Sequence, residues 1–261
     1  MVLSRSASPR ELVTRLARGS SVARRAVRHP AVLAAHRHYF TARLHARRLR
    51  HDLTHAAGID PLRLYWISPD RISKKMWGGR EFGKPMAGRV VGGDWDRDVQ
   101  RLEDYDLYGM LRAHFEDGVP WESTAHYRSL LERVRAGETV WHRCSSRADI
   151  DARCAGLDDL YRRIDRDGVL APRAVESSGS GDPLSDDLLN RFPVDLGAIS
   201  VDVGRDGDPI LDDGRHRLIV AKLCDVAEIP VTVLVRHRRW QAKRDEWANG
   251  RESFDHFDRP L

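Results

Sequence analysis

The sequence has 261 residues, of which 41% are hydrophobic and 32% are charged, so the chain is long enough and apolar enough to form one large domain with a hydrophobic core. No apolar run approaches the roughly 20 residues that a membrane-spanning helix needs, and we therefore expect no such helix. The three cysteines, Cys144, Cys154 and Cys224, are too few and too scattered for a disulfide framework, which predicts a cytoplasmic protein.

The positive charge is concentrated near the start of the chain. Residues 1–57 contain twelve arginines, no lysine and two acidic residues, a formal charge of +10, so the remaining residues carry −5 of the net +5. This asymmetry predicts a polyanionic partner for residues 1–57, either nucleic acid or an anionic membrane surface. A solvated basic face or an organellar transit peptide would explain the same composition.

Two helices are predicted within this basic segment, over residues 10–28 and 31–53. In the second, Leu33, Phe40 and Leu44 share one face, and arginine and histidine cover most of the rest. We therefore expect residues 1–57 to form a basic helical arm. Such an arm can lie on lipid or on phosphates, or it can cover its own domain.

The main domain is expected to span residues 58–261. Alternating apolar residues predict a strand at 62–67, and the glycine-rich stretch 77–93 predicts a loop with a short strand at 89–91. Three helices are then expected, the last of them bounded by the capping pair Ser146 and Asp149 and by Gly168; their ranges are 100–117, 121–136 and 147–167.

The last part of the chain predicts a mixed strand and helix segment. Residues 176–183 have the composition of a flexible linker. After it, Gly204-Arg205-Asp206-Gly207 predicts a hairpin between strands at 198–203 and 209–213. A helix from Gly214 and a strand at 229–235 follow, and the basic residues 236–244 are expected to continue that strand. The fold class is therefore α+β.

The junction "DDGRHR" carries the strongest functional signal. A helix that begins just after a strand presents free backbone N–H groups and the positive end of its dipole. Gly214 lets backbone approach a ligand closely, Arg215 and Arg217 add fixed positive charge, and His216 can donate to a phosphate or move a proton. The junction therefore predicts a phosphate site, with a charged surface turn as the alternative.

Acidic residues in two places are candidates for catalysis or for binding Mg²⁺. Alternation along the strand puts Asp212 and Asp213 on opposite faces, so one of them is expected to face the site and the other to cap the helix. We take Asp213 as the residue facing the site. Asp94 and Asp96 are the second pair, predicted as an acidic catalytic group and a metal ligand, unless they only form a turn.

Aromatic residues in the expected helical region, Trp121, Tyr127 and Trp141, are either a stacking surface for a base or sugar, or core residues.

The segment "SVDVGRDGDPILDDGRHRLIVAKLCDVAEIPVTVLV" resembles the core of the ParB/sulfiredoxin superfamily, with its Gly-x-x-Arg at a helix start and its following "IPV" strand. "YWISPDRI", at 65–72, is similar to the opening strand of that family. The resemblance implies a small mixed sheet with core segments 60–96 and 192–245, and a helical insertion at 97–190.

Members of the superfamily include sulfiredoxin, a free-serine kinase and the CTP-hydrolysing ParB proteins. Gly214, His216 and Arg217 match the phosphate-binding residues, whereas Arg215 replaces the reactive cysteine of sulfiredoxin, which excludes sulfinic acid reduction. The resemblance implies a protein that binds ATP or CTP with Mg²⁺ and acts as a phosphotransferase or NTPase. In that function Asp213, His216 and Asp94 would be catalytic, and Asp213 and Asp96 would bind the metal. The alternative is a nucleic-acid-binding regulator that uses the basic arm.

Overall fold

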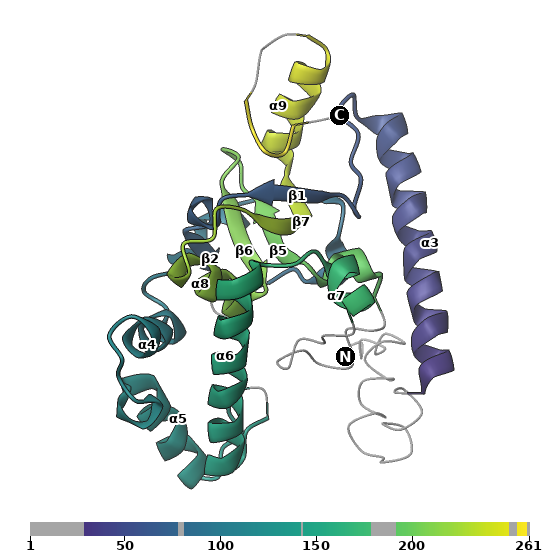
Figure 1. Cartoon of the computed structure of the whole chain (residues 1–261). Helices are drawn as coiled ribbons and strands as arrows, with labels where there is room; N and C mark the ends of the chain where they lie inside the picture. The colour runs from purple at the N-terminus through teal and green to yellow at the C-terminus, as the bar shows by residue number, and fades with distance from the viewer. Residues whose placement is uncertain (1–28, 78–80, 142, 179–191, 251–254, 260–261) are drawn as a thin grey trace, which may run out of the picture.

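The computed structural model describes residues 29–77, 81–141, 143–178, 192–250 and 255–259, which form an α+β fold (Figure 1). The predicted fold class is confirmed. One mixed sheet has the strand order β1-β7-β5-β6-β2-β4, and β3 also pairs with β7. Within these ranges no helix has the length and apolar character needed to cross a membrane.

The strands of the sheet are short at its edges and long at its centre. They are β1 (Leu64–Ile67), β2 (Lys74–Met76), β3 (Arg89–Val91), β4 (Val99–Arg101), β5 (Ile199–Val203), β6 (Pro209–Asp213) and β7 (Ile229–His237). β5 and β7 are parallel and buried along their whole length, which suits their β-branched side chains. The hairpin predicted between β5 and β6 is present, with Gly207 at a φ of +97° in its turn.

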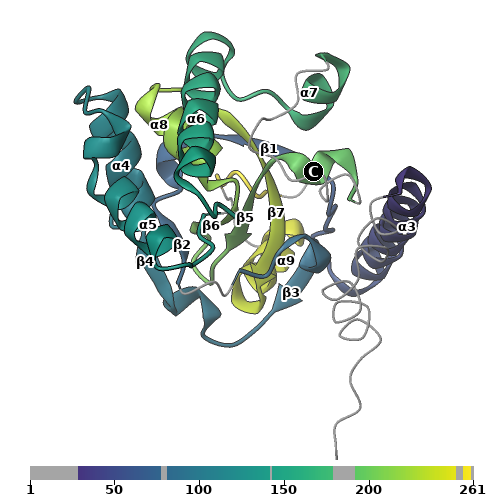
Figure 2. The ribbon, with the colours of Figure 1, turned by 90° about the horizontal axis from the view of Figure 1, so that it is seen from below.

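Helices cover the sheet on two sides (Figures 1 and 2). The elements α4 (Asp106–Phe115), α5 (Ala125–Arg135), α6 (Arg147–Asp167) and α7 (Pro172–Ser178) lie between β4 and β5, where the helical insertion was expected. α8 (Arg215–Leu223) packs on the sheet, and α4 and α6 pack against α8. The predicted capping box of Ser146 and Asp149 is present at the start of α6.

Helix α3 (Pro30–Thr54) stands on the side of the sheet opposite α4 and α5 (Figures 1 and 2). The helix predicted at 31–53 is thus confirmed, whereas the one predicted at 10–28 lies outside the described residues. Phe40 and Leu44 of α3 are buried against Phe192, and the rings of Phe40 and Phe192 meet edge to face at 5.0 Å. The buried Nε2 of His51 lies 2.6 Å from the carbonyl oxygen of Gly88.

Three sequence predictions are wrong. Residues 100 and 101, expected to begin a helix, belong to β4 instead, because they pair with β2 and α4 starts only at Asp106. Residues from 238 onward, expected to continue a strand, form α9 (Arg238–Ala248). Residues 176–178, expected to belong to a linker, are the end of α7. Each error concerns a short segment whose structure depends on a distant partner rather than on its own pattern.

A buried ion network connects the end of β7 and the start of α9 to residues 255–259. Asp258 is fully buried and accepts from Arg236 Nη2 at 2.5 Å and from Trp240 Nε1 at 2.9 Å. Burial alone would raise the pKa of Asp258, but the guanidinium of Arg236 holds it below its ordinary value. Residues 255–259 are therefore part of the folded core.

Candidate functional site

The candidate site begins at Gly214, between β6 and α8. Its φ of +93° lies in the left-handed region that glycine adopts readily. A Cβ atom at this position would lie 3.1 Å from the Cα atom of Ile199 on β5, so a side chain would press on the strand backbone. The glycine therefore starts α8 directly at the end of β6, and the first N–H groups of α8 carry the positive end of its dipole.

Asp213 joins this junction to the loop that follows β2. Its Oδ2 accepts from Lys84 Nζ at 2.6 Å, and its Oδ1 accepts from the N–H of Gly214 at 2.8 Å. Burial alone would raise the pKa of Asp213, but the ammonium of Lys84 holds it below its ordinary value. Lys84 itself is 6% exposed, so the structure places a buried cation beside the start of α8.

Three more cationic side chains lie around the same point. Arg217 Nη1 donates to the carbonyl oxygen of Gly197 at 2.6 Å, and its charge helps to lower the pKa of Asp213. Lys75 on β2 is 8% exposed; burial lowers its pKa, against the charge of Glu81, which raises it, and the charge of Arg215 lowers it further. Cations from β2, from the following loop and from α8 thus gather at one end of α8.

His216 contacts the helical insertion through Trp141. Trp141 Nε1 donates to His216 Nε2 at 3.4 Å, a long bond. Trp141 has a φ of +36° and Arg143 a φ of +77°, in a tight loop closed by the bridge between Val140 and Cys144. A non-glycine residue with a positive φ lowers the stability of the folded state by on the order of 1–3 kcal/mol, and such residues are concentrated at functional sites.

Asp212 faces the other way and meets a second carboxyl group inside the sheet. Its Oδ2 accepts from the N–H of Gly83 at 3.0 Å, while Asp202 Oδ1 accepts from the N–H of Val235 at 3.0 Å. The remaining oxygens, Asp202 Oδ2 and Asp212 Oδ1, are buried with no other hydrogen-bond partner among the described residues. Burial raises the pKa of Asp212 to about 6. Burial and the neighbouring carboxyl of Asp212 raise the pKa of Asp202 well above its ordinary value, which favours a shared proton on this pair of carboxyl groups.

The predicted opposition of Asp212 and Asp213 is therefore observed, and Asp213 is the one beside the positive cluster. Sequence analysis did not single out Asp202, Lys75 or Lys84. The signal for Asp202 was an aspartate within an otherwise apolar strand. The two lysines carry no local signal, because Lys75 is placed by the pairing of β2 with β6 and Lys84 by its bond to Asp213.

Asp94 and Asp96 lie elsewhere. Asp96 Oδ2 accepts from the backbone N–H and from Nε of Arg205, each at 2.8 Å, and Asp94 Oδ1 accepts from Arg205 Nη2 at 2.7 Å. Burial would raise the pKa of Asp96, but the bonds from Arg205 lower it to about 2. Arg205 is in the turn between β5 and β6, so this pair lies at the opposite end of β6 from Gly214.

The structure thus does not bring Asp96 and Asp213 together as ligands of one Mg²⁺ ion, and Asp94 is not beside His216. Both oxygens of Asp213 and both of Asp96 accept hydrogen bonds from the chain itself. Across the described part of the chain no group of three or more His, Cys, Asp or Glu side chains is arranged to hold a metal ion. The residues present therefore do not fit a metal site supplied by the protein alone.

The aromatic residues of the insertion have different places. Trp121 stacks on His114 at 3.7 Å between ring centroids, and Tyr127 is 2% exposed with its hydroxyl bonded to Asp151, so both belong to the packing of the insertion. Trp141 alone of the three predicted aromatics contacts the residues of the "DDGRHR" junction.

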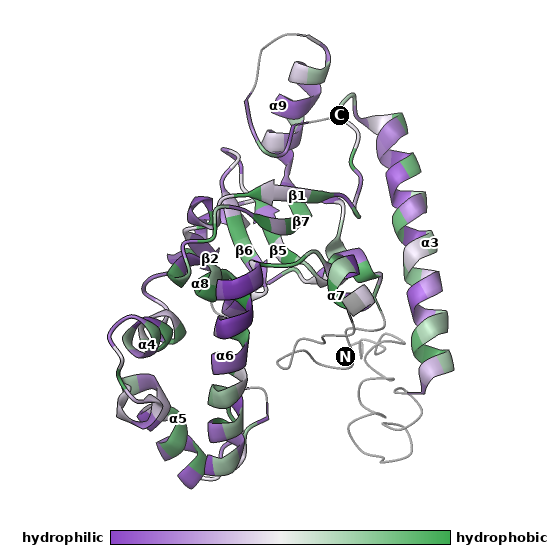
Figure 3. Cartoon of the chain, viewed as in Figure 1, coloured by the Kyte–Doolittle hydropathy of each residue, from purple (hydrophilic) through white to green (hydrophobic). Residues whose placement is uncertain are grey.

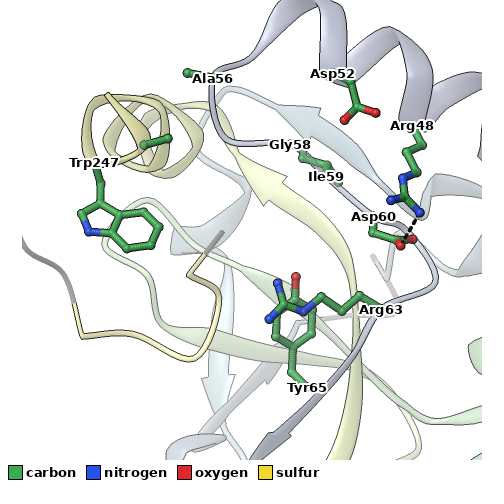
Figure 4. A pocket seen from close by; sticks show the side chains of 10 residues that line it. Arg48, Asp52, Ala56, Gly58, Ile59, Asp60, Arg63, Tyr65 and Trp247 are labelled. Atoms are coloured by element: carbon green, nitrogen blue, oxygen red, sulfur yellow. Dashed lines mark hydrogen bonds and ion pairs between the residues drawn. The ribbon is translucent and has the colours of Figure 1, made fainter. Parts of the chain in front are cut away.

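A cavity of about 450 Å³ lies apart from this site, between the end of α3, β1 and α9 (Figure 4). The guanidinium of Arg63 covers the ring of Tyr65 at 4.7 Å on one side of it, and Trp247 lies across from them. Arg48 and Asp60 form an ion pair of 2.7 Å at its edge. None of the residues predicted for the phosphate site lines this cavity.

No family model, no curated protein and no solved structure matches this chain. The resemblance to the ParB/sulfiredoxin superfamily therefore stays a prediction that is based on the residues quoted above.

Proposed function

We propose that the protein binds a nucleoside triphosphate, with its phosphate groups at the N-terminal end of α8. The observation that carries the proposal is a group of four cationic side chains: Lys84, Arg215 and Arg217 lie at this helix end, and Lys75 on β2 is near enough for the charge of Arg215 to act on it. Two of them are lysines that are more than nine-tenths buried, at 8% and 6% exposure. Buried cations are costly unless they meet negative charge; Asp213 pairs with Lys84, and the charge of Glu81 acts on Lys75, so two carboxylates stand against the four cations.

The chemistry of the cluster suits phosphate better than a carboxylate or a metal ion. Backbone N–H groups after Gly214 and the guanidinium groups of Arg215 and Arg217 are donors without acceptor capacity, which match the oxygens of a phosphate chain. In the proposal, Trp141 offers a ring face to the base or sugar, since it lies beside His216 at the same helix end.

The reaction that we propose is transfer of a phosphoryl group to an acceptor, or hydrolysis of the nucleotide. Two groups of the site can take part in proton movement: the carboxylate of Asp213 and the imidazole of His216. The lowered pKa of Asp213 keeps it ionised at neutral pH, so it acts as an acceptor of hydrogen bonds more readily than as a strong base. Asp94 has no part in this proposal, because it is held by Arg205 at the far end of β6.

Calorimetric titration of the full-length protein with ATP, CTP, GTP and ADP, in the presence of magnesium, tests the proposal. We expect Arg217→Ala and Arg215→Gln each to weaken binding at least about tenfold, or ~1.4 kcal/mol. Arg215→Gln is the second variant because Arg217 also holds the Gly197 carbonyl. Lys222→Gln is the matched control, since Lys222 is at the other end of α8 and pairs with Asp70.

Unchanged affinity in both arginine variants, or no binding of any of these nucleotides, would remove the proposal. An equal loss in Lys222→Gln would assign the effect to a general weakening of α8 and would also count against the site. Thermal denaturation of each variant separates loss of binding from loss of fold.

A further inference from the structure

Helix α3 is held to the domain by one narrow face. Its buried residues are Phe40, Leu44 and His51. At roughly 100° of rotation per residue, these three fall within an arc of about 40°. The opposite side of this 25-residue helix faces outward, on the side of the sheet away from α4 and α5 (Figures 1 and 2).

The outward side of α3 carries an apolar stripe. Four of the seven large hydrophobic side chains that are exposed in the described residues belong to this helix: Val32 at 48%, Tyr39 at 60%, Leu49 at 66% and Leu53 at 87%. They fall within an arc of about 100°, whose centre is about 150° from the buried face. Exposed small apolar residues fill the gaps between them, namely Ala31, Ala35 and Ala46. Figure 3 shows hydrophobic and hydrophilic residues alternating along α3.

Basic side chains border this stripe on both edges. Arg43 and Arg50 follow one edge, and the guanidinium of Arg43 lies 5.6 Å from the ring centre of Tyr39. His38 and His45 follow the other edge. Asp52 is the single acidic residue of the helix and lies outside the stripe.

Two other arginines of α3 are used inside the protein. Arg47 donates to the carbonyl oxygen of Ala87, and Arg48 pairs with Asp60 at 2.7 Å. The arginines beside the stripe are thus distinct from those that fasten the helix to the domain.

We propose that α3 binds the surface of an anionic membrane, with the stripe of Val32, Tyr39, Leu49 and Leu53 buried at the boundary between headgroups and acyl chains. A helix that lies in this boundary needs an apolar face, and basic residues beside it meet the anionic headgroups. The stripe on α3 provides both within one arc of the helix.

Other occupants fit the stripe less well. A nucleic acid would be bound through its phosphates, which would leave Leu49 and Leu53 in water. A second copy of the chain, joined stripe to stripe with the two helices antiparallel, would place the arginine edges of the helices, and so like charges, side by side. An anionic lipid surface is the occupant that accepts both the leucines and the arginines.

Flotation of the full-length protein with vesicles tests this surface. The vesicles contain phosphatidylcholine alone or phosphatidylcholine with phosphatidylserine, and we expect binding to the anionic vesicles. Arg43→Gln/Arg50→Gln should weaken that binding about fivefold per arginine removed. Leu49→Ala/Leu53→Ala should weaken it at least about tenfold, because two apolar side chains no longer enter the bilayer.

Matched controls come from exposed residues elsewhere. Arg162→Gln/Arg166→Gln removes the same charge from α6, and Leu170→Ala removes an exposed leucine that is not on α3. Neither should change vesicle binding. These positions are exposed, except Arg43, which is half-buried, and none is in the core, so we expect the melting temperature of every variant to stay near that of the wild type.

Several results would overturn the proposal: failure of the wild type to float with anionic vesicles, wild-type binding by Leu49→Ala/Leu53→Ala, or an equal loss in the control variants. Salt-dependent binding of duplex DNA or RNA without vesicle binding would identify a nucleic-acid surface instead. A dimer that Leu49→Ala/Leu53→Ala converts to a monomer would show that a second copy covers the stripe. Nucleotide affinity should be equal in all these variants, so this proposal and the proposed function fail or stand separately.

Discussion

Replacement of Asp212 by asparagine should stabilise the protein at neutral pH and remove a fall in stability on going from acid to neutral solution. Asp212 and Asp202 are two buried carboxyl groups whose unpartnered oxygens lie within the same part of the sheet. Burial raises the pKa of Asp212 from 3.8 to about 6. Asparagine keeps an oxygen for the Gly83 N–H, offers an amide donor to Asp202, and cannot ionise.

The magnitude follows from linkage between protonation and folding. Because the folded state binds the proton of Asp212 more tightly than the unfolded state, the contribution of Asp212 to the free energy of unfolding is largest below the unfolded pKa. It then falls as the pH rises through the folded pKa. A pKa moved from 3.8 to about 6 corresponds to about 3 kcal/mol, lost between about pH 4 and pH 6. We expect Asp212→Asn to recover about 1–3 kcal/mol at neutral pH, less any loss from imperfect bonding of the amide.

Urea unfolding of both proteins at several pH values measures this difference. The quantity compared is the difference in unfolding free energy between wild type and variant at each pH, in which carboxylates distant from Asp212 cancel and the coupled Asp202 does not. Asp213→Asn is the control: the pKa of Asp213 is lowered by Lys84, so its removal should destabilise the protein at neutral pH. Parallel pH profiles for wild type and Asp212→Asn, or a variant that is less stable at neutral pH, would refute the shared proton.

Three further predictions concern positions that the fold uses. Asp96→Asn should destabilise the protein above the unfolded pKa of 3.8, and this difference from wild type should vanish as the pH falls toward the folded pKa of about 2, as measured by acid titration of thermal stability. Gly214→Ala should cost about 1–3 kcal/mol in urea unfolding, because its φ of +93° disfavours any Cβ atom; a cost near zero would contradict the close approach to β5. Phe40→Ala should cost about 3–5 kcal/mol and speed hydrogen exchange in α3 first, since Phe40 and Phe192 pack α3 to the domain; exchange equal to that of wild type would show that other contacts hold the helix.

The sequence predicted the parts of the candidate site that are local in the chain. The turn at Gly204–Gly207 needs glycine at positive φ, and Gly214 needs it for the same reason, so both are visible from residue type alone. The start of α8 and the opposition of Asp212 and Asp213 follow from the alternation of a strand that leads into a helix. These features depend on backbone geometry within a few residues.

The sequence also predicted α3 and α6, because both segments are longer than a typical strand and have apolar residues at helical spacing. In α6 the capping pair and Gly168 also predicted both ends of the helix. The sequence failed at β4 and α9. β4 has only three residues, and its extended structure depends on its pairing with β2. The basic residues of α9 have the composition of an exposed strand end, and the sequence does not show that Arg236 and Trp240 bind Asp258.

Only the tertiary structure decided which charges meet. Lys75 lies beside Leu211 of β6 because β2 pairs with β6, Lys84 bonds Asp213 from the loop after β2, and Asp202 meets Asp212 because β5 and β6 form one hairpin. The separation of Asp94 and Asp96 from Asp213 was decided in the same way, by Arg205 at the other end of that hairpin. Electrostatic interaction depends on distance in space, and residues distant in sequence have no fixed distance until the sheet has formed. The sequence by itself determined where α8 starts and that Gly214 stands there. The tertiary structure determined which cationic side chains lie near that helix start.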